Sequence, residues 1–378
     1  RLNYPLIDGV VNGCPSHLLE PQRLQLIQYS EAFDNAYWTK NGASVVSDAA
    51  ISPDGSLNAF KLVEDTSTGA HLISRSLFGS GVNLAKYTLS VFAKKGERDL
   101  LVIQDGTTVN NAFFDLTNGV VDGITGTGTA KIESLGNHFY RCSFTFTQSG
   151  VDLRPQFALA DITLSGSPPS YTGDGTSGFY IFGAQLEQGS YPTSYIPNYG
   201  TSAGITRVAE TANGAGDAST FNDSEGVLMV ETKGENDGTF NYISLSDGGT
   251  TNYAGILYTD TDNQITYRYY VGGSGVQIII ENIIVTNFNK IAIKYKANDF
   301  AIWINGIEVG TASSGSLNPS GTFNQLAFAR GGSNNTPFYG NTKQIQYFDS
   351  ALNDSDLETL TSWVSFTDMA NGQLYSVE

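Results

Sequence analysis

Apolar and polar residues alternate in short runs along the chain, and turn residues separate the runs. In "FYRCSFTFT", residues 139–147, every second residue from Tyr140 to Phe146 is aromatic or cysteine, and polar residues stand between them. A period of two places one face of a strand in a core and the other in water. Similar runs, rich in β-branched and aromatic residues, recur through both halves of the chain. The pattern predicts an all-β fold.

The runs are numerous enough for two antiparallel β-sandwiches (jelly rolls) in tandem. "GFYIFGAQLE", residues 178–187, is apolar on both faces, which is typical of a central strand, and "YPTSYIPN" follows it. A residue before proline favours an extended conformation, and proline cannot donate to an inner ladder, so the chain should leave the sheet as an extended strap. The predicted division is an extended N-terminal segment at 1–27, a first sandwich at 28–198, a linker at 199–215 and a second sandwich at 216–378.

Two local signals refine the second half. "ALNDSDLETLTSW", residues 351–363, predicts one short C-terminal helix, because Asn353 can cap it with Asp356 three residues further on. Leucines at helical spacing follow the cap. Asn305 and Gly306 separate "FAIWI" from "IEVG", and both residue types favour the positive φ angles of a two-residue hairpin turn.

Composition limits the classes of partner. The formal net charge is −17, from 37 acidic and 20 basic residues, and no cluster of Lys and Arg is present. Binding to nucleic acid is therefore not expected. No apolar run is as long as a membrane span, so membrane insertion is not expected either. The chain begins at Arg1, which leaves open whether sequence upstream was removed, and Cys14 and Cys142 leave a disulfide open.

Both halves resemble known families. "LLEPQRLQLIQYSEAFDNAYWTK" and "DGTSGFYIFGAQLEQGSYPTSYIPNYGTSAGITRVAE", within residues 18–210, resemble a domain of phage tail and virion proteins. That domain is similar to the jelly-roll carbohydrate-binding modules of polysaccharide-degrading enzymes. "FAIWINGIEV" and "KQIQYFDSALNDSDLETL" resemble a concanavalin A-like, laminin G-like sandwich. The resemblance implies a surface-exposed adhesion or virion protein and names no ligand.

Sugar binding needs an aromatic face for the apolar side of the ring and polar groups for the hydroxyls. In "FAIWINGIEV", inward-facing Phe and Ile residues leave Trp303 and Asn305 on the other face. In "ITYRYYVGG", Arg268 and Tyr270 share one face of a strand. These four residues are the predicted ligand-binding groups. The alternative for Trp303 is that the opposing sheet or the final helix covers it.

Loop carboxylates raise the question of a metal. Asp174, Asp260 and Asp262 lie in predicted loops, where oxygen ligands could hold a structural calcium ion as the cofactor. Residues of the same types also form ordinary turns, and no set of six or more oxygen ligands can be identified. Both interpretations stay open.

Enzymatic activity is not expected. Asp354, Asp356 and Glu358 have the closest spacing to a set of glucanase carboxylates. On a helix, residues two apart point to different sides, so these side chains match acidic charge at a helix N-terminus instead. Glycoside hydrolysis requires a convergent pair of carboxylates, and the sequence shows none.

The predicted function is that of a non-enzymatic phage virion protein, a fibre or tail-associated component at the virion surface. Its expected partners are a host-surface polysaccharide or glycan and other virion proteins. Binding through many copies favours a symmetric homo-oligomer, for example a trimer. Two alternatives remain: a purely structural virion decoration protein, and a secreted bacterial carbohydrate-binding adhesin.

Overall fold

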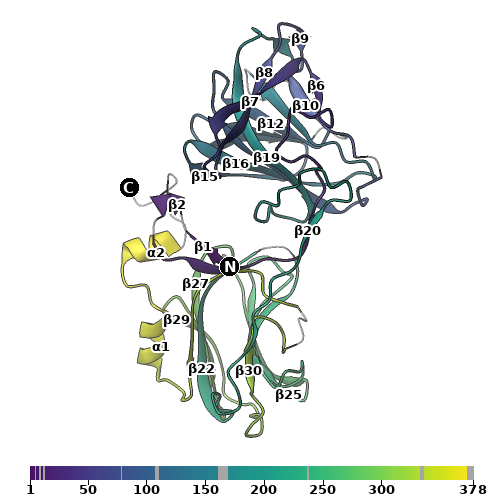
Figure 1. Cartoon of the computed structure of the whole chain (residues 1–378). Coiled ribbons are helices and arrows are strands. Elements are labelled where there is room, and N and C mark those ends of the chain that lie inside the picture. The colour runs from purple at the N-terminus through teal and green to yellow at the C-terminus, as the bar shows by residue number, and fades with distance from the viewer. Residues whose placement is uncertain are drawn as a thin grey trace. The chain divides into compact units, whose positions relative to one another are not determined.

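The chain forms two compact units. The computed structural model describes residues 1–4, 6–7, 10–11, 13–77, 79–106, 110–160, 169–235, 238–332 and 336–372. We name the unit of Leu6–Asn12 and Gln22–Val208 the first sandwich, and the unit of Arg1–Pro5, Gly13–Pro21 and Ala209–Glu378 the second sandwich (Figure 1). Antiparallel strands build both units, which confirms the expected all-β, two-sandwich fold.

Two six-stranded antiparallel sheets enclose the core of the first sandwich. The first sheet has the order β14 (Val120–Thr125), β13 (Asn111–Asp115), β12 (Leu100–Gln104), β17 (Gln156–Ala160), β10 (Leu72–Ser74), β6 (Thr39–Asn41). The second has the order β15 (Thr129–Gly136), β16 (Phe139–Thr147), β11 (Lys86–Lys94), β19 (Gly178–Gln188), β8 (Leu57–Glu64), β7 (Ala43–Ile51). Three short pairs complete the unit: β2 (Leu6–Ile7) with β3 (Val10–Val11), β5 (Arg23–Gln25) with β20 (Ile205–Arg207), and β9 (Thr68–Gly69) with β18 (Tyr171–Thr172).

The core of the first sandwich follows the alternation in the sequence. Cys142, Phe144 and Phe146 of β16 enter the core, as the period of two predicts. Cys142 is a buried free thiol and Cys14 an exposed one, so the structure contains no disulfide between them.

Polar side chains of β19 fasten the strap, which we define as residues 191–198. Gln185 donates from its amide nitrogen to the Thr193 carbonyl (3.2 Å) and accepts from the Ile196 backbone N–H (2.7 Å). Glu187 accepts from the backbone N–H (2.8 Å) and the hydroxyl (2.6 Å) of Thr193. Side-chain hydrogen bonds thus replace the ladder that the prolines of the strap cannot form.

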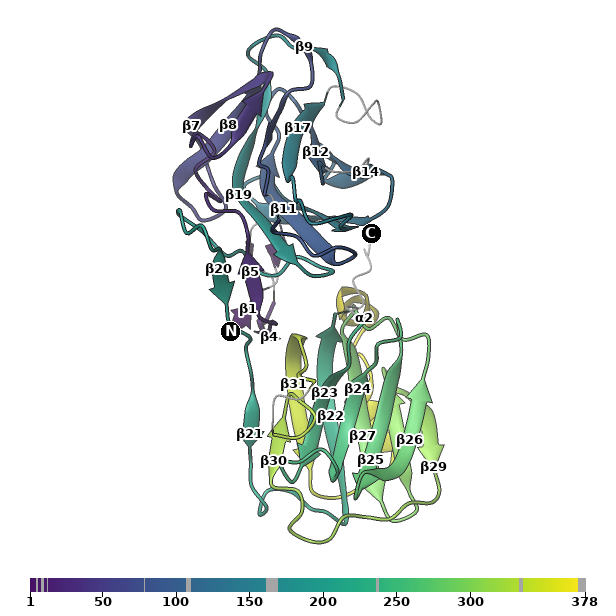
Figure 2. The same cartoon turned by 90° about the vertical axis from the view of Figure 1, so that its right-hand side faces the viewer.

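The second sandwich also has two layers (Figure 2). Its seven-stranded sheet has the order β1 (Leu2–Asn3), β4 (Ser16–Leu19), β31 (Gly340–Phe348), β22 (Glu225–Gly234), β27 (Asn289–Lys296), β28 (Phe300–Ile304), β29 (Ile307–Ala312). Its six-stranded sheet has the order β21 (Asn213–Ala215), β30 (Gln325–Ala327), β23 (Asn241–Ser246), β24 (Tyr253–Tyr258), β25 (Ile265–Val271), β26 (Ser274–Ile280).

The N-terminal residues are divided between the two units. Residues 1–27 were expected to form one extended segment, but β4 pairs with β31 in the second sandwich, whereas β5 pairs with β20 in the first. Leu19 is buried in the core of the second sandwich, and the Asn341 side chain donates to the Ser16 hydroxyl (2.8 Å). The expected linker at 199–215 likewise contains β20 and β21, each paired within its own unit.

Two helices follow β31 among the described residues: α1 (Asp354–Thr361) and α2 (Phe366–Gly372). The Asn353 side chain accepts a hydrogen bond from the Asp356 backbone N–H (3.0 Å), which confirms the predicted cap of α1. The sequence did not predict α2. Within the described ranges, no helix combines the length and apolar character needed to cross a membrane.

A buried carboxylate joins three segments of the first sandwich. Arg98 donates to both oxygens of Glu64 (Nε to Oε2, 2.8 Å; Nη2 to Oε1, 2.7 Å). The Tyr171 hydroxyl (2.7 Å) and the Asp174 backbone N–H (2.9 Å) donate to the same carboxylate. Burial would raise the pKa of Glu64, but these hydrogen bonds outweigh it and hold the pKa below its ordinary value of 4.5.

Stability from a carboxyl group with a lowered pKa is present above its unfolded-state pKa and is lost as the pH falls through the folded-state pKa. We therefore expect Glu64→Gln to lower the free energy of unfolding of the first sandwich by about 2 kcal/mol at neutral pH. The difference from wild type should shrink below pH 4.5, the ordinary pKa of the group. Urea unfolding across this pH range measures both effects.

The control is Glu97→Gln, because Glu97 is 55% exposed and pairs with Lys61 at the surface. It should change the free energy of unfolding by less than about 1 kcal/mol. A Glu64→Gln effect that is equal at neutral and acidic pH would contradict the pKa argument.

Candidate functional site

The strap covers only part of the outer face of the sheet that contains β19. Tyr195 of the strap packs its ring on Phe92 (5.5 Å between ring centres) and Phe182 (6.0 Å). Gly183 of β19 has φ +60°, and a Cβ atom there would lie 2.8 Å from the Phe92 ring and 3.1 Å from Tyr195. Glycine therefore allows both the backbone angle and the close approach of the rings.

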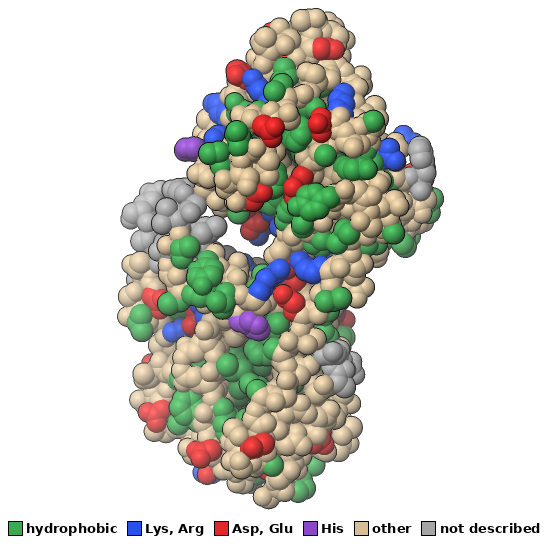
Figure 3. Space-filling view, in the orientation of Figure 1, with side chains coloured by type: hydrophobic (Ala, Val, Ile, Leu, Met, Phe, Trp, Pro, Cys, Tyr) green, Lys and Arg blue, Asp and Glu red, His purple; other side chains and the backbone are tan. Residues whose placement is uncertain are grey.

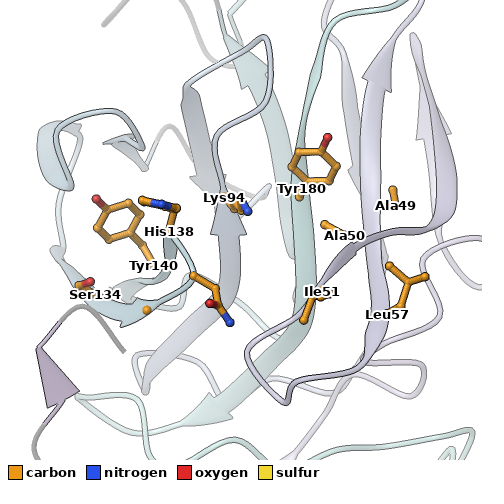
Figure 4. A pocket seen from close by; sticks show the side chains of 11 residues that line it. Ala49, Ala50, Ile51, Leu57, Lys94, Ser134, His138, Tyr140 and Tyr180 are labelled. Atoms are coloured by element: carbon orange, nitrogen blue, oxygen red, sulfur yellow. The ribbon is translucent and has the colours of Figure 1, made fainter. Parts of the chain in front are cut away.

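A groove of about 870 Å³ crosses the rest of this face. Figure 4 shows Tyr140 and His138 at one end, Lys94 and Tyr180 in the middle, and Ile51 and Leu57 at the other end. The groove spans the sheet from β15 to β7. At its β15 end Tyr140 packs on the core side of the sheet and beside Gly119, so its ring lies at the edge of the groove and not on the outer face. It is lined by Ala49, Ala50, Ile51, Leu57, Lys94, Ser134, Gly136, Asn137, His138, Tyr140 and Tyr180.

Local backbone geometry shapes one end of the groove. Asn137 and His138 connect β15 to β16 and have φ angles of 51° and 60°. Two successive positive φ angles match the tight turn that suits a twisted hairpin. The turn leaves the side chains of both residues exposed at the rim.

The polar groups of the groove are open to a ligand. The hydroxyls of Tyr140 and Tyr180 make no hydrogen bond to another described residue. The Lys94 ammonium lies 5.8 Å from the centre of the Phe139 ring, and no ion pair involves Lys94 within the described ranges. Acidic and basic side chains are interspersed on the face of the molecule shown in Figure 3.

These groups offer several kinds of contact to a ligand. Aromatic rings and the apolar Ile51 and Leu57 offer contact area, while hydroxyl, amide and ammonium groups offer hydrogen bonds. The described lining residues include no Asp or Glu, so among them there is no pair of carboxyl groups of the kind that glycoside hydrolysis requires.

The structure does not present Trp303 as an exposed platform. Trp303 is only 7% exposed and packs with Leu357 of α1 and Met229 of β22. The alternation within β28 does direct Trp303 away from the main core, but α1 covers that face of the seven-stranded sheet. The structure therefore agrees with the alternative interpretation, in which a C-terminal helix, here α1, covers Trp303.

Asn305 has a structural role in the predicted hairpin turn. It has φ 52°, followed by Gly306 at φ 84°. Its side chain accepts from the Lys290 backbone N–H (3.0 Å) and donates to the Asn289 side chain (2.9 Å). Asn305 therefore joins the β28–β29 turn to β27.

Arg268 and Tyr270 are on the other sheet from Trp303 and Asn305, so the four predicted ligand-binding residues do not form one site. Arg268 lies near Tyr270, with its guanidinium carbon 5.7 Å from the ring centre. The predicted calcium ligands are separated too: Asp174 is in the first sandwich, and Asp260 and Asp262 are in the second.

Asp174 forms an ordinary turn. Its carboxylate accepts from the backbone N–H groups of Thr176 (2.8 Å) and Ser177 (2.7 Å) and from both hydroxyls. The hydrogen bonds from Ser177 and Thr176 lower the pKa of Asp174. Asp260 and Asp262 are exposed. Across the described ranges, no three His, Cys, Asp or Glu side chains group closely enough to hold a metal ion.

Comparison with known proteins adds a family match in the second sandwich. Residues 228–358 match a family described as the concanavalin A-like lectin/glucanases superfamily. These residues run from β22 into α1, so the match lies within the second sandwich. No curated protein matches the chain.

The solved structures that are similar to the chain include the following two. The IT-sialidase CBM40 of Ruminococcus gnavus is 16% identical with a TM-score of 0.35, and the match covers 40% of this chain and 97% of that one. Domains LG4-5 of the mouse laminin alpha1 chain are 9% identical with a TM-score of 0.27, and the match covers 76% of this chain and 90% of that one.

Burial under α1 predicts that Trp303 stabilises the fold. Trp303→Ala should lower the free energy of unfolding of the second sandwich by about 3 kcal/mol, because it leaves a cavity between α1 and the sheet. Val364→Ala is the control, since Val364 is 87% exposed, and its effect should stay within about 0.5 kcal/mol. Urea unfolding of both variants measures this, and equal stability of the two would contradict the assignment.

Proposed function

We propose that the chain is a non-enzymatic glycan-binding protein of a phage virion, a fibre or tail-associated component. The observation that carries the proposal is the groove of the first sandwich, where Tyr180 and Lys94 line the surface and none of the described lining residues is a carboxylate. A sugar ring can place its C–H face on a tyrosine ring while its hydroxyls bond to tyrosine hydroxyls and the Asn137 amide. The match of the second sandwich to a lectin/glucanase superfamily supports the same class of ligand.

The location and assembly are also proposals. The resemblance of the β19 strand and its strap to phage tail and virion domains supports a virion surface, where host glycans and other virion proteins would be the partners. Several weak sites on one particle gain avidity without new contacts, which favours a symmetric homo-oligomer such as a trimer. A structural calcium ion at Asp260 and Asp262 stays a prediction.

The test is a glycan array probed with the purified chain, wild type and Tyr180→Ala. Tyr180 is half-buried in the middle of the groove, and loss of its ring should weaken binding about tenfold, equivalent to about 1.4 kcal/mol. Tyr199→Ala is the matched control, because Tyr199 is 74% exposed and does not line the groove. It should bind as wild type does.

Two outcomes would count against the proposal. Equal binding by wild type and Tyr180→Ala would place the glycan elsewhere on the chain. An absence of binding to every glycan on the array would favour a purely structural decoration protein. Repeating the array with a calcium chelator tests the calcium prediction, since binding that needs a calcium-ordered loop would be lost.

A further inference from the structure

Three tyrosines and two arginines gather on the outer face of the six-stranded sheet of the second sandwich. Tyr242 comes from β23, Tyr253 from β24, and Arg268 and Tyr270 from β25, while Arg330 follows β30. Their neighbours along these strands fill the core, so these side chains project to the opposite side.

The rings of Tyr242, Tyr253 and Tyr270 form one continuous aromatic surface, which we name the tyrosine floor. The ring centres of Tyr242 and Tyr253 are 6.0 Å apart, and those of Tyr253 and Tyr270 are 5.3 Å apart. Gly255 leaves room for this arrangement, because a Cβ atom there would lie 3.3 Å from the Tyr253 ring. Tyr242 and Tyr253 are almost fully buried although they point outward, so other side chains must cover them.

Arg330 is one of the covering groups, and its backbone is fixed in place. Its guanidinium carbon lies 5.4 Å from the Tyr253 ring centre and 5.8 Å from that of Tyr242. The Ser244 hydroxyl donates to the carbonyl of Ala329 (2.7 Å) and accepts from the N–H of Gly331 (3.2 Å), on either side of Arg330. Nη2 of Arg330 donates to the Thr250 carbonyl (3.0 Å).

Arg268 is oriented by neutral partners. It donates from Nη1 to the Tyr242 hydroxyl (2.6 Å) and from Nε to the Gln277 amide oxygen (3.1 Å). The Tyr270 hydroxyl donates to the same oxygen (3.1 Å). Both guanidiniums therefore contact Tyr242, Arg268 at its hydroxyl and Arg330 over its ring.

Neither guanidinium is neutralised by a carboxylate within the described ranges. By contrast, Lys294, Lys296 and Lys343 of the same sandwich each form an ion pair with Asp or Glu. The chain as a whole has a net charge of −17. That net charge repels anions from most of the surface, so an anion bound here must be held by local contacts.

We propose that this face binds the anionic group of an acidic saccharide, a carboxylate or a sulfate ester, between Arg268 and Arg330. A guanidinium matches the two oxygens of such a group with two parallel N–H donors, and each arginine has donors beyond those already used. The half-buried Tyr270 ring offers the stacking surface for the sugar next to the anion. The inference rests on the proposed function only in taking a saccharide as the carrier of the anion, because the groove belongs to the other sandwich.

The experiment measures affinity by calorimetry for oligogalacturonate, dextran sulfate and unmodified dextran of similar length. The full chain carries Tyr180→Ala, so that the groove contributes little. We expect both acidic polymers, or one of them, to bind at least tenfold more tightly than dextran, and the stronger of the two distinguishes carboxylate from sulfate. Binding should weaken as salt is raised.

Arg268→Gln and Arg330→Gln should each reduce the affinity for the acidic polymer about tenfold. Lys296→Gln is the matched control, since it removes one positive charge of the second sandwich from the other sheet, and it should change affinity less than twofold. Arg330→Lys keeps the charge but loses the paired donors, and an intermediate affinity would show that geometry matters. Circular dichroism and urea unfolding verify that each variant is folded.

Three results would overturn the inference: no preference of the Tyr180→Ala chain for acidic polymers, an equal loss in Lys296→Gln, or folded arginine variants that bind as the parent does. If these occur while the wild-type chain binds glycans on the array, the inference fails and the proposed function stands. Acidic polymers could bind as described here while Tyr180→Ala leaves array binding unchanged. That result would contradict glycan binding in the groove and would support the anion site at Arg268 and Arg330.

Discussion

Two buried polar side chains determine how the first sandwich presents its outer face. Gln185 and Glu187 of β19 are fully buried, and a buried amide or carboxylate without hydrogen bonds would cost several kcal/mol. Thr193 and Ile196 of the strap satisfy them, so the strap must cross the sheet at this point. The described residues leave the remaining part of the face uncovered, and the groove occupies it.

The two sandwiches use their outer faces in related ways. In each, one covering element takes part of the surface: the strap in the first and α1 in the second. Elsewhere these faces carry aromatic side chains together with cations that have no carboxylate partner among the described residues: Lys94 in the groove, and Arg268 with Arg330 on the tyrosine floor. The faces of the sheets, more than the loops, therefore present the groups suited to binding.

Much of the fold could be predicted because it depends on neighbours in sequence. The alternation in β16, the Asn353 cap and the Asn305–Gly306 turn are all local patterns, and the structure contains each of them. The pairing of β4 with β31 could not be predicted in this way. It joins Ser16 to Asn341 across 325 positions, and β4 is too short to show a period.

The sites were harder to predict for the same reason. Alternation correctly directs Trp303 away from the main core, but it cannot show that α1 covers it. It also placed Arg268 and Tyr270 on one face, whereas Tyr242 and Arg330 join them only through cross-strand register. The groove combines residues of β7, β8, β11, β15, β16 and β19, which no single stretch of sequence brings together.

The most direct test of this account is photo-crosslinking of the wild-type chain with a diazirine-bearing form of a glycan that binds on the array. Peptide mapping by mass spectrometry locates the attachment points. We predict crosslinks in the groove, within residues 49–57, 134–140 and around Tyr180. Crosslinks confined to α1 and the β28–β29 hairpin would contradict the claim that the open sheet faces bind the ligand.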